Sequence, residues 1–440
     1  MRVRIGSGAG FSGDRVEPAV DLAERAGLDD LVLECLAERT TALGQQRRLA
    51  DPATGYDPRL SARLGALLPA ALRAGVRIVT NMGAANPAAA GVLVRDLLDR
   101  AGSSAPVAVV TGDDVLTAID LDAPASEDGV PLRAHGEVVS ANAYLGADAV
   151  LPALEHDPAV VITGRVADPA LFLAPLAHRF GWDLHDRSST GLDVVAAGTL
   201  VGHLLECAGQ LTGGYFADPG STDVPRLAEL GFPFADVGRD GSAEYAKLPG
   251  TGGRLDRHTV REQLLYEVTD PTGYLTPDVV LDLRGVRVRH VGADRVRVDG
   301  ARGRPRPDRL KVTVGYRAGH RTEAEISYAG PNALARARLA ADVLARRVRA
   351  LPLRPRIEVL GLADAAGDAE CRVRVAARHA HPDLLDALAW EVESLYTNGP
   401  AGGGGVRVHT AELIGAVSTT VPRAAVRPAV TVLGATRALA

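Results

Sequence analysis

Lysine is almost missing from this sequence. Only Lys247 and Lys311 among its 49 basic residues are lysines, and all the others are arginines. GC-biased codon usage replaces lysine wherever any cation will serve. A lysine that remains is then more often one whose compact, titratable ammonium group matters. This makes Lys247 a candidate catalytic residue, and Lys311 a weaker candidate.

Cysteines and long apolar runs are also scarce. Cys35, Cys207 and Cys371 lie far apart and form no CxxC or CxxH pair, which argues against a disulfide framework or structural zinc and indicates a reducing compartment. No stretch approaches the eighteen apolar residues of a membrane span, and the N-terminus runs directly into a strand-like segment. We therefore expect neither a membrane span nor a signal peptide, and a cytoplasmic location.

Charge excludes further classes of partner. The net charge is −5 and charged residues make up 23% of the chain, so nothing suggests electrostatic binding to nucleic acid or to an anionic membrane. We expect a small-molecule substrate, no bound metal, and a homo-oligomer.

The first 190 residues alternate short apolar runs with amphipathic stretches. Runs rich in β-branched residues predict buried parallel strands, and helical patterns lie between them. The predicted strands are 3–5, 31–36, 76–81, 106–112 and 159–164, and the predicted helices are 16–26, 60–74, 86–102 and one from 168 onward. This rhythm is typical of an α/β Rossmann-like domain over 1–190, with a mostly parallel sheet and helices on both faces.

The rest of the chain is predicted to form two further segments. Residues 191–284 contain one helix near 193–210 and many Gly, Pro and Asp residues, which indicates a connecting region of loops. Strand alternation returns from 285, with helices over 333–350 and 382–397 and a last strand near 406–423. We therefore predict a smaller α+β domain over 285–440.

A glycine-rich loop follows the first predicted strand. Gly8, Gly10 and Gly13 match the GxGxxG pattern, and Glu34 ends the next strand where a dinucleotide fold places its ribose-binding acid. However, Glu17-Pro18 delays the following helix by about one turn. The loop could bind a dinucleotide, another phosphate or carboxylate, or no ligand.

Polar residues end each predicted parallel strand. Glu34, Asn81, Asp113 and Arg165 follow four different strands, and Asp168 comes three residues after Arg165. Because ligands of open α/β sheets bind outside the carboxyl ends of the strands, these side chains should converge on one edge. Arg165 is a candidate for contacting a carboxylate or phosphate, whereas Asp168, just before a proline, is better suited to capping a helix.

His203 and Glu206 lie three residues apart on one predicted helix and so share a face. Such a pair can hold a metal ion, act as an oriented acid–base couple, or form a hydrogen-bonded pair inside a core. A third metal ligand is not evident in the sequence.

The stretch from Lys247 to Arg254 places two cations around Gly250, Gly252 and Gly253. It could be a mobile loop that cradles an anion with its backbone amides, although it lacks the spacing of a P-loop, or an ordinary surface turn.

Several long motifs resemble the acyclic terpene utilisation (AtuA-like) family. They include IGSGAGFSGDR (5–15), IVTNMGAANP (78–87), ITGRVADPALFLAPL (162–176), HLLECAGQLTGGYFADPG (203–220), KLPGTGGR (247–254) and LYTNGPAGGGG (395–405). Members are similar to a protein encoded beside geranyl-CoA carboxylase in the degradation of citronellol and geraniol. Many also carry a further C-terminal ferredoxin-like domain, so the resemblance implies a possible separately encoded partner of that kind, or carboxylase subunits.

The resemblance implies three alternative functions. The first is an enzyme acting on a branched, isoprenoid-like acyl-CoA or acid, of hydratase or lyase type, with coenzyme A possible as part of the substrate and no redox cofactor. Such an enzyme needs a base, an acid and an enolate stabiliser, for which Glu34 or Asp113, Lys247 or His203, and the glycine-loop amides are candidates. The second is a non-catalytic acyl-CoA- or nucleotide-binding subunit assisting a geranyl-CoA-type carboxylase, and the third a nucleotide-dependent enzyme using the loop at 6–14.

Overall fold

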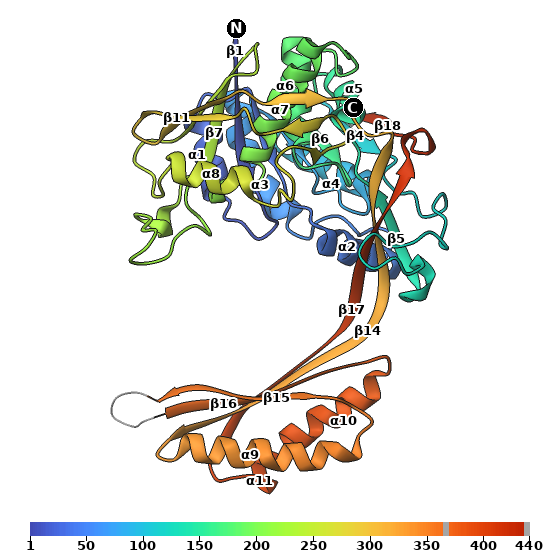
Figure 1. Ribbon diagram of the computed structural model, residues 1–440, viewed down its shortest axis with the longest axis vertical. Coiled ribbons are helices and arrows are strands. Elements are labelled where there is room, and N and C mark those ends of the chain that lie inside the picture. Colours follow the sequence, from blue (N-terminus) through green and yellow to red (C-terminus); the bar gives the residue numbers. More distant parts are fainter. Residues whose placement is uncertain (364–368, 435–440) are drawn as a thin grey trace. The chain divides into compact units, whose positions relative to one another are not determined.

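The chain divides into two compact units (Figure 1). The computed structural model describes residues 1–363 and 369–434. Unit 1 comprises Met1–Leu132, Val139–Val314 and the chain from residue 416 onward, and unit 2 comprises Arg133–Val138 and Gly315–Gly415. Within the described residues, every helix is too short or too polar to cross a membrane.

Unit 1 is built on one large mixed sheet. Its centre is five neighbouring parallel strands, each formed by an apolar, mostly β-branched run and fully or largely buried: β1 (Arg2–Ala9), β2 (Asp30–Leu33), β3 (Arg77–Thr80), β6 (Val160–Thr163) and β4 (Val107–Thr111). The mixed α/β class predicted from the sequence is confirmed. Since these strands are parallel, their carboxyl ends meet along one edge.

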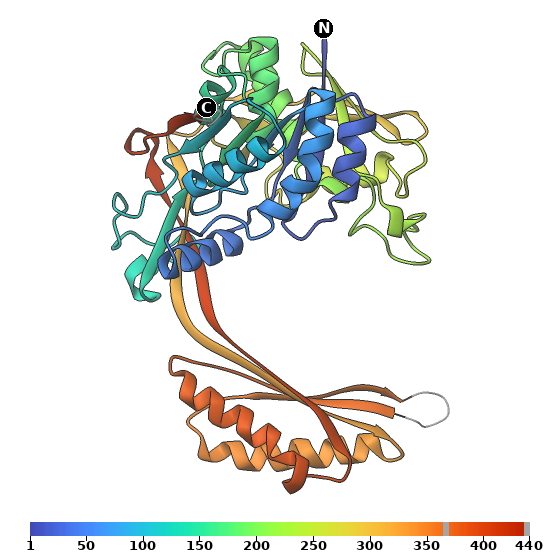
Figure 2. The same cartoon turned by 180° about the vertical axis from the view of Figure 1, so that it is seen from behind.

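Helices cover both faces of this sheet (Figure 2). One face packs against α1 (Glu17–Arg25), α3 (Leu60–Ala74) and α4 (Pro87–Arg100), whose leucines and alanines share a core with the strands. The other face packs against α5 (Ala147–Leu154) and α6 (Ala170–Phe180), and α7 (Ser189–Leu205) packs on α6. This double cover explains why the central strands are apolar on both sides.

Antiparallel strands extend the sheet at both ends. Beside β1 lie β7 (Pro233–Gly238), β8 (Ala243–Lys247), β12 (Arg295–Asp299) and β11 (Arg287–Gly292), and β18 (Ala429–Leu433) pairs with β4. The units therefore differ from the predicted segments 1–190, 191–284 and 285–440. The reason is that strands far along the sequence pair into the first sheet, which local residue patterns do not reveal.

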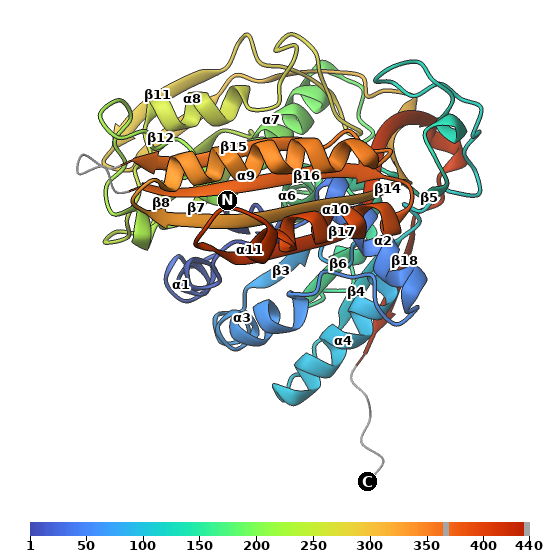
Figure 3. The same ribbon diagram turned by 90° about the horizontal axis from the view of Figure 1, so that it is seen from below.

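Unit 2 has the element order β-α-β-β-α-β. Its elements are β14 (Arg309–Gly330), α9 (Ala333–Arg347), β15 (Arg356–Ala363), β16 (Ala369–His379), α10 (Pro382–Glu393), the short α11 (Leu395–Asn398) and β17 (Gly403–Pro422). The start of β14, up to Val314, and the end of β17, from Ala416, belong to unit 1. The sheet order β15-β16-β14-β17 is that of a ferredoxin-like fold, with α9 and α10 over its apolar face (Figure 3). β14 is one continuous strand of 22 residues within the region from 285 where strand alternation was predicted.

The remaining elements belong to loops and edges around the main sheet. They are α2 (Glu38–Ala50), α8 (Arg257–Leu265), β5 (Val138–Ala143), which pairs with β14, and a small sheet of β9 (Tyr274–Leu275), β10 (Val280–Asp282) and β13 (Arg302–Arg304).

Gly10 is required by packing at the end of β1. A Cβ atom at this position would lie 2.3 Å from the carbonyl carbon and 2.4 Å from the Cα atom of Cys207. Real Cβ atoms do not approach backbone atoms so closely, so the turn after α7 can contact the first loop only because residue 10 has no side chain.

We predict that Gly10→Ala lowers the free energy of unfolding by about 1–3 kcal/mol, the usual cost of overpacking a rigid contact. Gly65→Ala is the matched control, because Gly65 lies in α3 with no atom within 4 Å of the added Cβ. That substitution should stabilise the protein by about 0.5–1 kcal/mol through helix propensity. Urea unfolding of both variants is the measurement, and a Gly10→Ala protein as stable as the parent would contradict the packing argument.

Candidate active site

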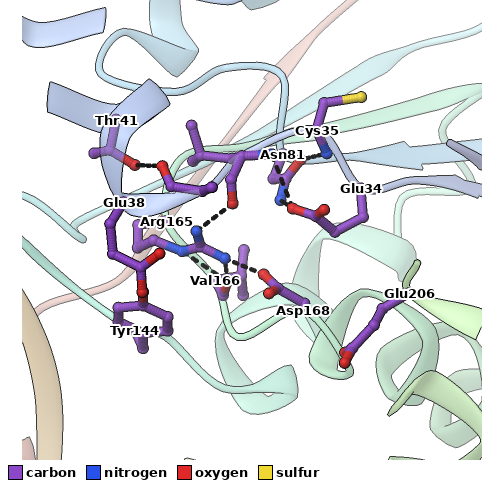
Figure 4. A network of polar contacts seen from close by, with 12 residues as sticks. Glu34, Cys35, Glu38, Thr41, Asn81, Tyr144, Arg165, Val166, Asp168 and Glu206 are labelled. Carbon is purple, nitrogen blue, oxygen red and sulfur yellow. Dashed lines mark hydrogen bonds and ion pairs between the residues drawn. The ribbon is translucent and has the colours of Figure 1, made fainter. Parts of the chain in front are cut away.

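Four polar residues at the strand ends lie together at one edge of the sheet (Figure 4 shows three of them). Glu34 follows β2, Asn81 follows β3, and Asp113 and Arg165 come two residues after β4 and β6. The Asn81 side chain donates to Glu34 Oε1 at 2.8 Å and accepts from the Cys35 amide at 2.8 Å. The Arg165 amide donates to Asp113 Oδ2 at 2.9 Å. Hydrogen bonds thus connect neighbouring strand ends in pairs.

The guanidinium of Arg165 connects these pairs. It is buried, and each of its three nitrogens donates to a protein oxygen: Nη1 to the Leu36 carbonyl, Nε and Nη2 to the Val166 carbonyl at 3.1 and 2.7 Å, and Nη2 also to Asp168. Its central carbon lies 4.5 Å from the centroid of the Tyr144 ring. Arg165 therefore organises the site, since four of its five N–H donors bind protein oxygens.

Asp113 accepts a hydrogen bond from the backbone of Arg165 and supports the loop that carries it. Besides the Arg165 amide it accepts from Asn142 Nδ2 at 2.9 Å, and only 4% of its surface is exposed. Burial raises the pKa of Asp113, although these hydrogen bonds oppose the shift. In this position Asp113 stabilises the loop after β6, and it is less suited to contact a substrate.

Glu34 and Asp168 are two carboxyl groups close enough to affect each other. Burial and the charge of Asp168 raise the pKa of Glu34 well above its usual value, outweighing Arg165 and the hydrogen bonds from Asn81 and the Leu36 amide. Burial also raises the pKa of Asp168, while Arg165 opposes it. Since 34% of the Asp168 side chain is exposed, it connects the buried groups with solvent.

Asp168 does not cap the helix that follows it, which corrects the sequence interpretation. Its carboxylate binds Arg165, and α6 begins at Ala170 with no side-chain cap. The corresponding residue before α4, Asn86, does cap its helix, accepting from the Ala89 amide at 3.2 Å. The nearby buried cation accounts for the difference.

His203 and Glu206 form a buried pair at the end of α7. His203 Nδ1 lies 3.0 Å from Glu206 Oε1, and Nε2 lies 3.2 Å from the Leu264 carbonyl. Because the Leu264 carbonyl can only accept a hydrogen bond, Nε2 of His203 carries a hydrogen. The hydrogen bond between Nδ1 and the Glu206 carboxyl group then needs one further proton, which the two groups share. Burial raises the pKa of Glu206 to about 7, with the charges of Asp168 and Glu267 adding to it and His203 opposing it. The pair therefore holds a proton up to about neutral pH.

A third group of residues reaches this place from elements that the sequence analysis did not connect with it. The Tyr144 hydroxyl donates to Glu38 Oε1 at 2.6 Å, and Lys311 Nζ donates to the same oxygen at 3.2 Å. Burial alone would raise the pKa of Glu38, but the hydrogen bonds from Tyr144 and from its own backbone amide, together with the charges of Lys311 and Arg165, outweigh it and lower the pKa to about 2. Figure 4 shows Glu38 and Tyr144 on one side of Arg165 and Glu34, Asp168 and Glu206 on the other. The rarity of lysine was the one sequence signal for this group.

The glycine-rich loop binds a carboxylate of its own. The Gly10 amide donates to Asp14 Oδ2 at 2.8 Å, and α1 begins only at Glu17. A Cβ at Gly8 would lie 2.6 Å from the Leu33 side chain, so that glycine serves strand packing, and at Gly13 it would lie 2.5 Å from the Phe11 ring. This geometry gives no support to the interpretation of the loop as a dinucleotide site.

The stretch from Lys247 to Arg254 is held by contacts with the rest of the protein, which favours the turn over the mobile loop among the two alternatives. Lys247 Nζ lies 3.0 Å from Asp294 Oδ2 and donates to the Thr251 carbonyl at 3.0 Å, and only 3% of its side chain is exposed.

Backbone hydrogen bonds hold the rest of this stretch. The Gly252 and Gly253 amides donate to the carbonyls of Glu229 and Pro225 at 2.7 and 2.8 Å, Gly250 takes the left-handed conformation of a turn, and Arg254 pairs with Asp256. These contacts give Lys247 and its neighbours a structural function.

The comparisons with known proteins identify a family. The model of the acyclic terpene utilisation family protein AtuA matches residues 3–432. No curated protein matches the chain. Within the described residues, no group of three or more His, Cys, Asp and Glu side chains is arranged to hold a metal ion, so His203 and Glu206 lack a third ligand there.

We predict that Lys247→Ala lowers the free energy of unfolding by about 2 kcal/mol, because it removes a buried ion pair and leaves Asp294 without its cation. The cost stays below that of a fully buried pair because 39% of the Asp294 side chain is exposed. Arg73→Ala is the control, since its pair with Glu24 is exposed on both sides and should change stability by at most about 0.5 kcal/mol. Equal stability of the two variants in urea unfolding would show that Lys247 is not structural.

Proposed function

The chain belongs to the acyclic terpene utilisation family, and we propose that it is an enzyme that adds water to, or removes water from, a branched isoprenoid-like acid or its acyl-CoA ester. The proposed catalytic centre is the strand-end site of Glu34, Asp168, His203 and Glu206. One observation carries this proposal: the site combines two buried carboxyl groups whose pKa values are raised, those of Glu34 and Glu206, with the carboxyl group of Asp168, which is partly exposed to solvent.

Adding water across a double bond requires a proton donor and a proton acceptor in one site. Glu34 supports the first function, because burial and the neighbouring charge of Asp168 raise its pKa and so favour its neutral, proton-bearing form. Asp168 supports the second, because its carboxyl group pairs with Arg165 and its exposed part can meet a water molecule. The pair of His203 and Glu206 is a second proton store beside them.

This assignment uses fewer residues than the sequence analysis offered. Lys247 is engaged with Asp294, Asp113 lies beneath the loop after β6, and the Gly10 amide is bound by Asp14. The acid and base functions therefore fall on the carboxyl groups.

The first test is Glu34→Gln. The amide keeps the shape of the side chain but has no proton to transfer, so turnover should fall by at least 100-fold, the typical range for loss of a general acid. The assay follows incorporation of oxygen from ¹⁸O-labelled water into branched unsaturated acids and their CoA esters by mass spectrometry. Glu24→Gln, in an exposed pair with Arg73, is the matched control and should keep the parent rate. Full turnover by Glu34→Gln would remove this residue from the mechanism.

The pH profile gives a second prediction. A carboxyl group whose pKa is raised to about 7 keeps its proton below that pH and loses it above, so kcat/KM should fall as the pH rises through about 7. In Glu206→Gln this fall should shift or disappear, because the amide does not titrate. A rate that keeps rising up to pH 9 in the parent protein would contradict a function for the shared proton.

A further inference from the structure

We infer that the strand-end site stabilises positive charge: it binds aliphatic ammonium groups, and in the proposed reaction it stabilises a carbocation-like transition state on an isolated, branched double bond. This inference rests on the proposed function for the reaction, but the binding of ammonium groups stands by itself. A reaction through a carbocation-like transition state differs from hydration through an enolate, because an enolate places negative charge in the site.

The first argument is the balance of charge. Five acidic residues act on one another here, since Glu38 and Glu267 both raise the pKa of Asp168 and Asp168 raises those of Glu34 and Glu206.

Three basic residues oppose these acids: Arg165 pairs with Asp168, Lys311 with Glu38, and His203 with Glu206. When the proton of Glu34 and the one shared by His203 and Glu206 are counted, three acids (Glu38, Asp168 and Glu267) remain against two cations (Arg165 and Lys311). When Glu34 gives up its proton, one more carboxylate forms beside the new cation, and attraction between them lowers the barrier.

The second argument is the shortage of donors for an oxyanion. An enolate needs N–H or O–H groups directed at its oxygen. The nitrogens of Arg165 bind carbonyls and Asp168, the Gly10 amide binds Asp14, and the Tyr144 hydroxyl binds Glu38. The Gly10 amide and the Tyr144 hydroxyl are thus already engaged with the protein, and so are four of the five N–H donors of Arg165.

The third argument is an unused acceptor beside aromatic rings. Oε2 of Glu206 is buried and has no hydrogen-bond partner among the residues that the structure describes, and Figure 4 shows this carboxyl group on the same side of Arg165 as Asp168. The Tyr274 ring lies 5.3 Å from that of His203, next to the same pair. An oxygen without a partner and the faces of tyrosine rings are both attractive to a cation.

Tyr144 shows that cations already bind to aromatic faces here. Arg165 lies 4.5 Å and Lys311 Nζ 4.9 Å from the centroid of its ring. The cost of bringing a weakly hydrated cation into such surroundings is low, because the ring quadrupole and the carboxylates replace its water.

The reaction step balances with water as the only co-reactant. The carboxyl proton of Glu34 moves to the less substituted carbon of the double bond, whose π electrons form the new C–H bond. Positive charge develops on the more substituted carbon. The oxygen of a water molecule forms a C–O bond there, and its proton passes to the Asp168 carboxylate. One water has been added, and the same steps in reverse remove it.

The test is binding of three probes of similar shape to the full chain by calorimetry at pH 7. N,N-Dimethyl-3-methylbutylamine is protonated at this pH, 2,5-dimethylhexane is its neutral counterpart (used at its solubility limit, in competition with the amine), and 4-methylpentanoate carries a negative charge. We expect the ammonium probe to bind at least 10-fold more tightly than the other two. Glu206→Gln and Asp168→Asn should each weaken its binding about 10-fold, and Glu24→Gln should leave it unchanged.

Tighter binding of the carboxylate, equal binding of the probes, or no binding of the ammonium probe would each overturn this inference. The outcome is separable from that of the proposed function. If Glu34→Gln loses turnover but the parent protein does not bind the ammonium probe, the hydratase proposal stands and the cation-stabilising site is wrong. If the ammonium probe binds in a way that depends on Glu206 and Asp168, but no acid or ester is turned over, the cation site stands and the hydratase proposal is wrong.

Discussion

Arg165 carries its positive charge where water does not reach it. Removing a guanidinium from water costs several kcal/mol, and the protein offsets this with the carboxylate of Asp168, the carbonyls of Leu36 and Val166, and the face of Tyr144. These partners come from the ends of β2 and β6 and from the segment after β5. Satisfying one buried cation therefore brings together the elements that also carry Glu34, Glu38 and Asp168.

The acids around this cation have pKa values that are shifted in opposite directions. Glu38, with hydrogen bonds from Tyr144 and Lys311, is a stable anion with a pKa of about 2. Glu34 is buried, has the charge of Asp168 nearby and makes no hydrogen bond with Arg165, and its pKa is raised well above the usual value. Neighbouring carboxyl groups with different protonation states are what acid–base chemistry near neutral pH requires.

Sequence patterns predicted the parts of this structure that depend on local residues. The apolar runs of β1 to β4 and β6 and the amphipathic pattern of α1, α3 and α4 are local, and the expectation that polar strand ends share one edge follows from parallel strands. Pairing between distant segments is not local, which is why the attachment of the strands at 233–299 to the first sheet and the continuity of the 22-residue β14 were not foreseen. The scarcity of lysine indicated two special positions but not their partners. Lys247 pairs with Asp294 in the fold, and Lys311, the weaker candidate, lies beside Glu38.

The central claim is that Glu34 holds a proton in the folded protein at neutral pH. Infrared difference spectroscopy of the parent protein against Glu34→Gln measures this directly, because a neutral carboxylic acid and a carboxylate absorb at different frequencies. At pH 7 the account predicts a carboxylic acid band in the parent protein that Glu34→Gln removes. A difference spectrum that contains only the loss of a carboxylate band would contradict it.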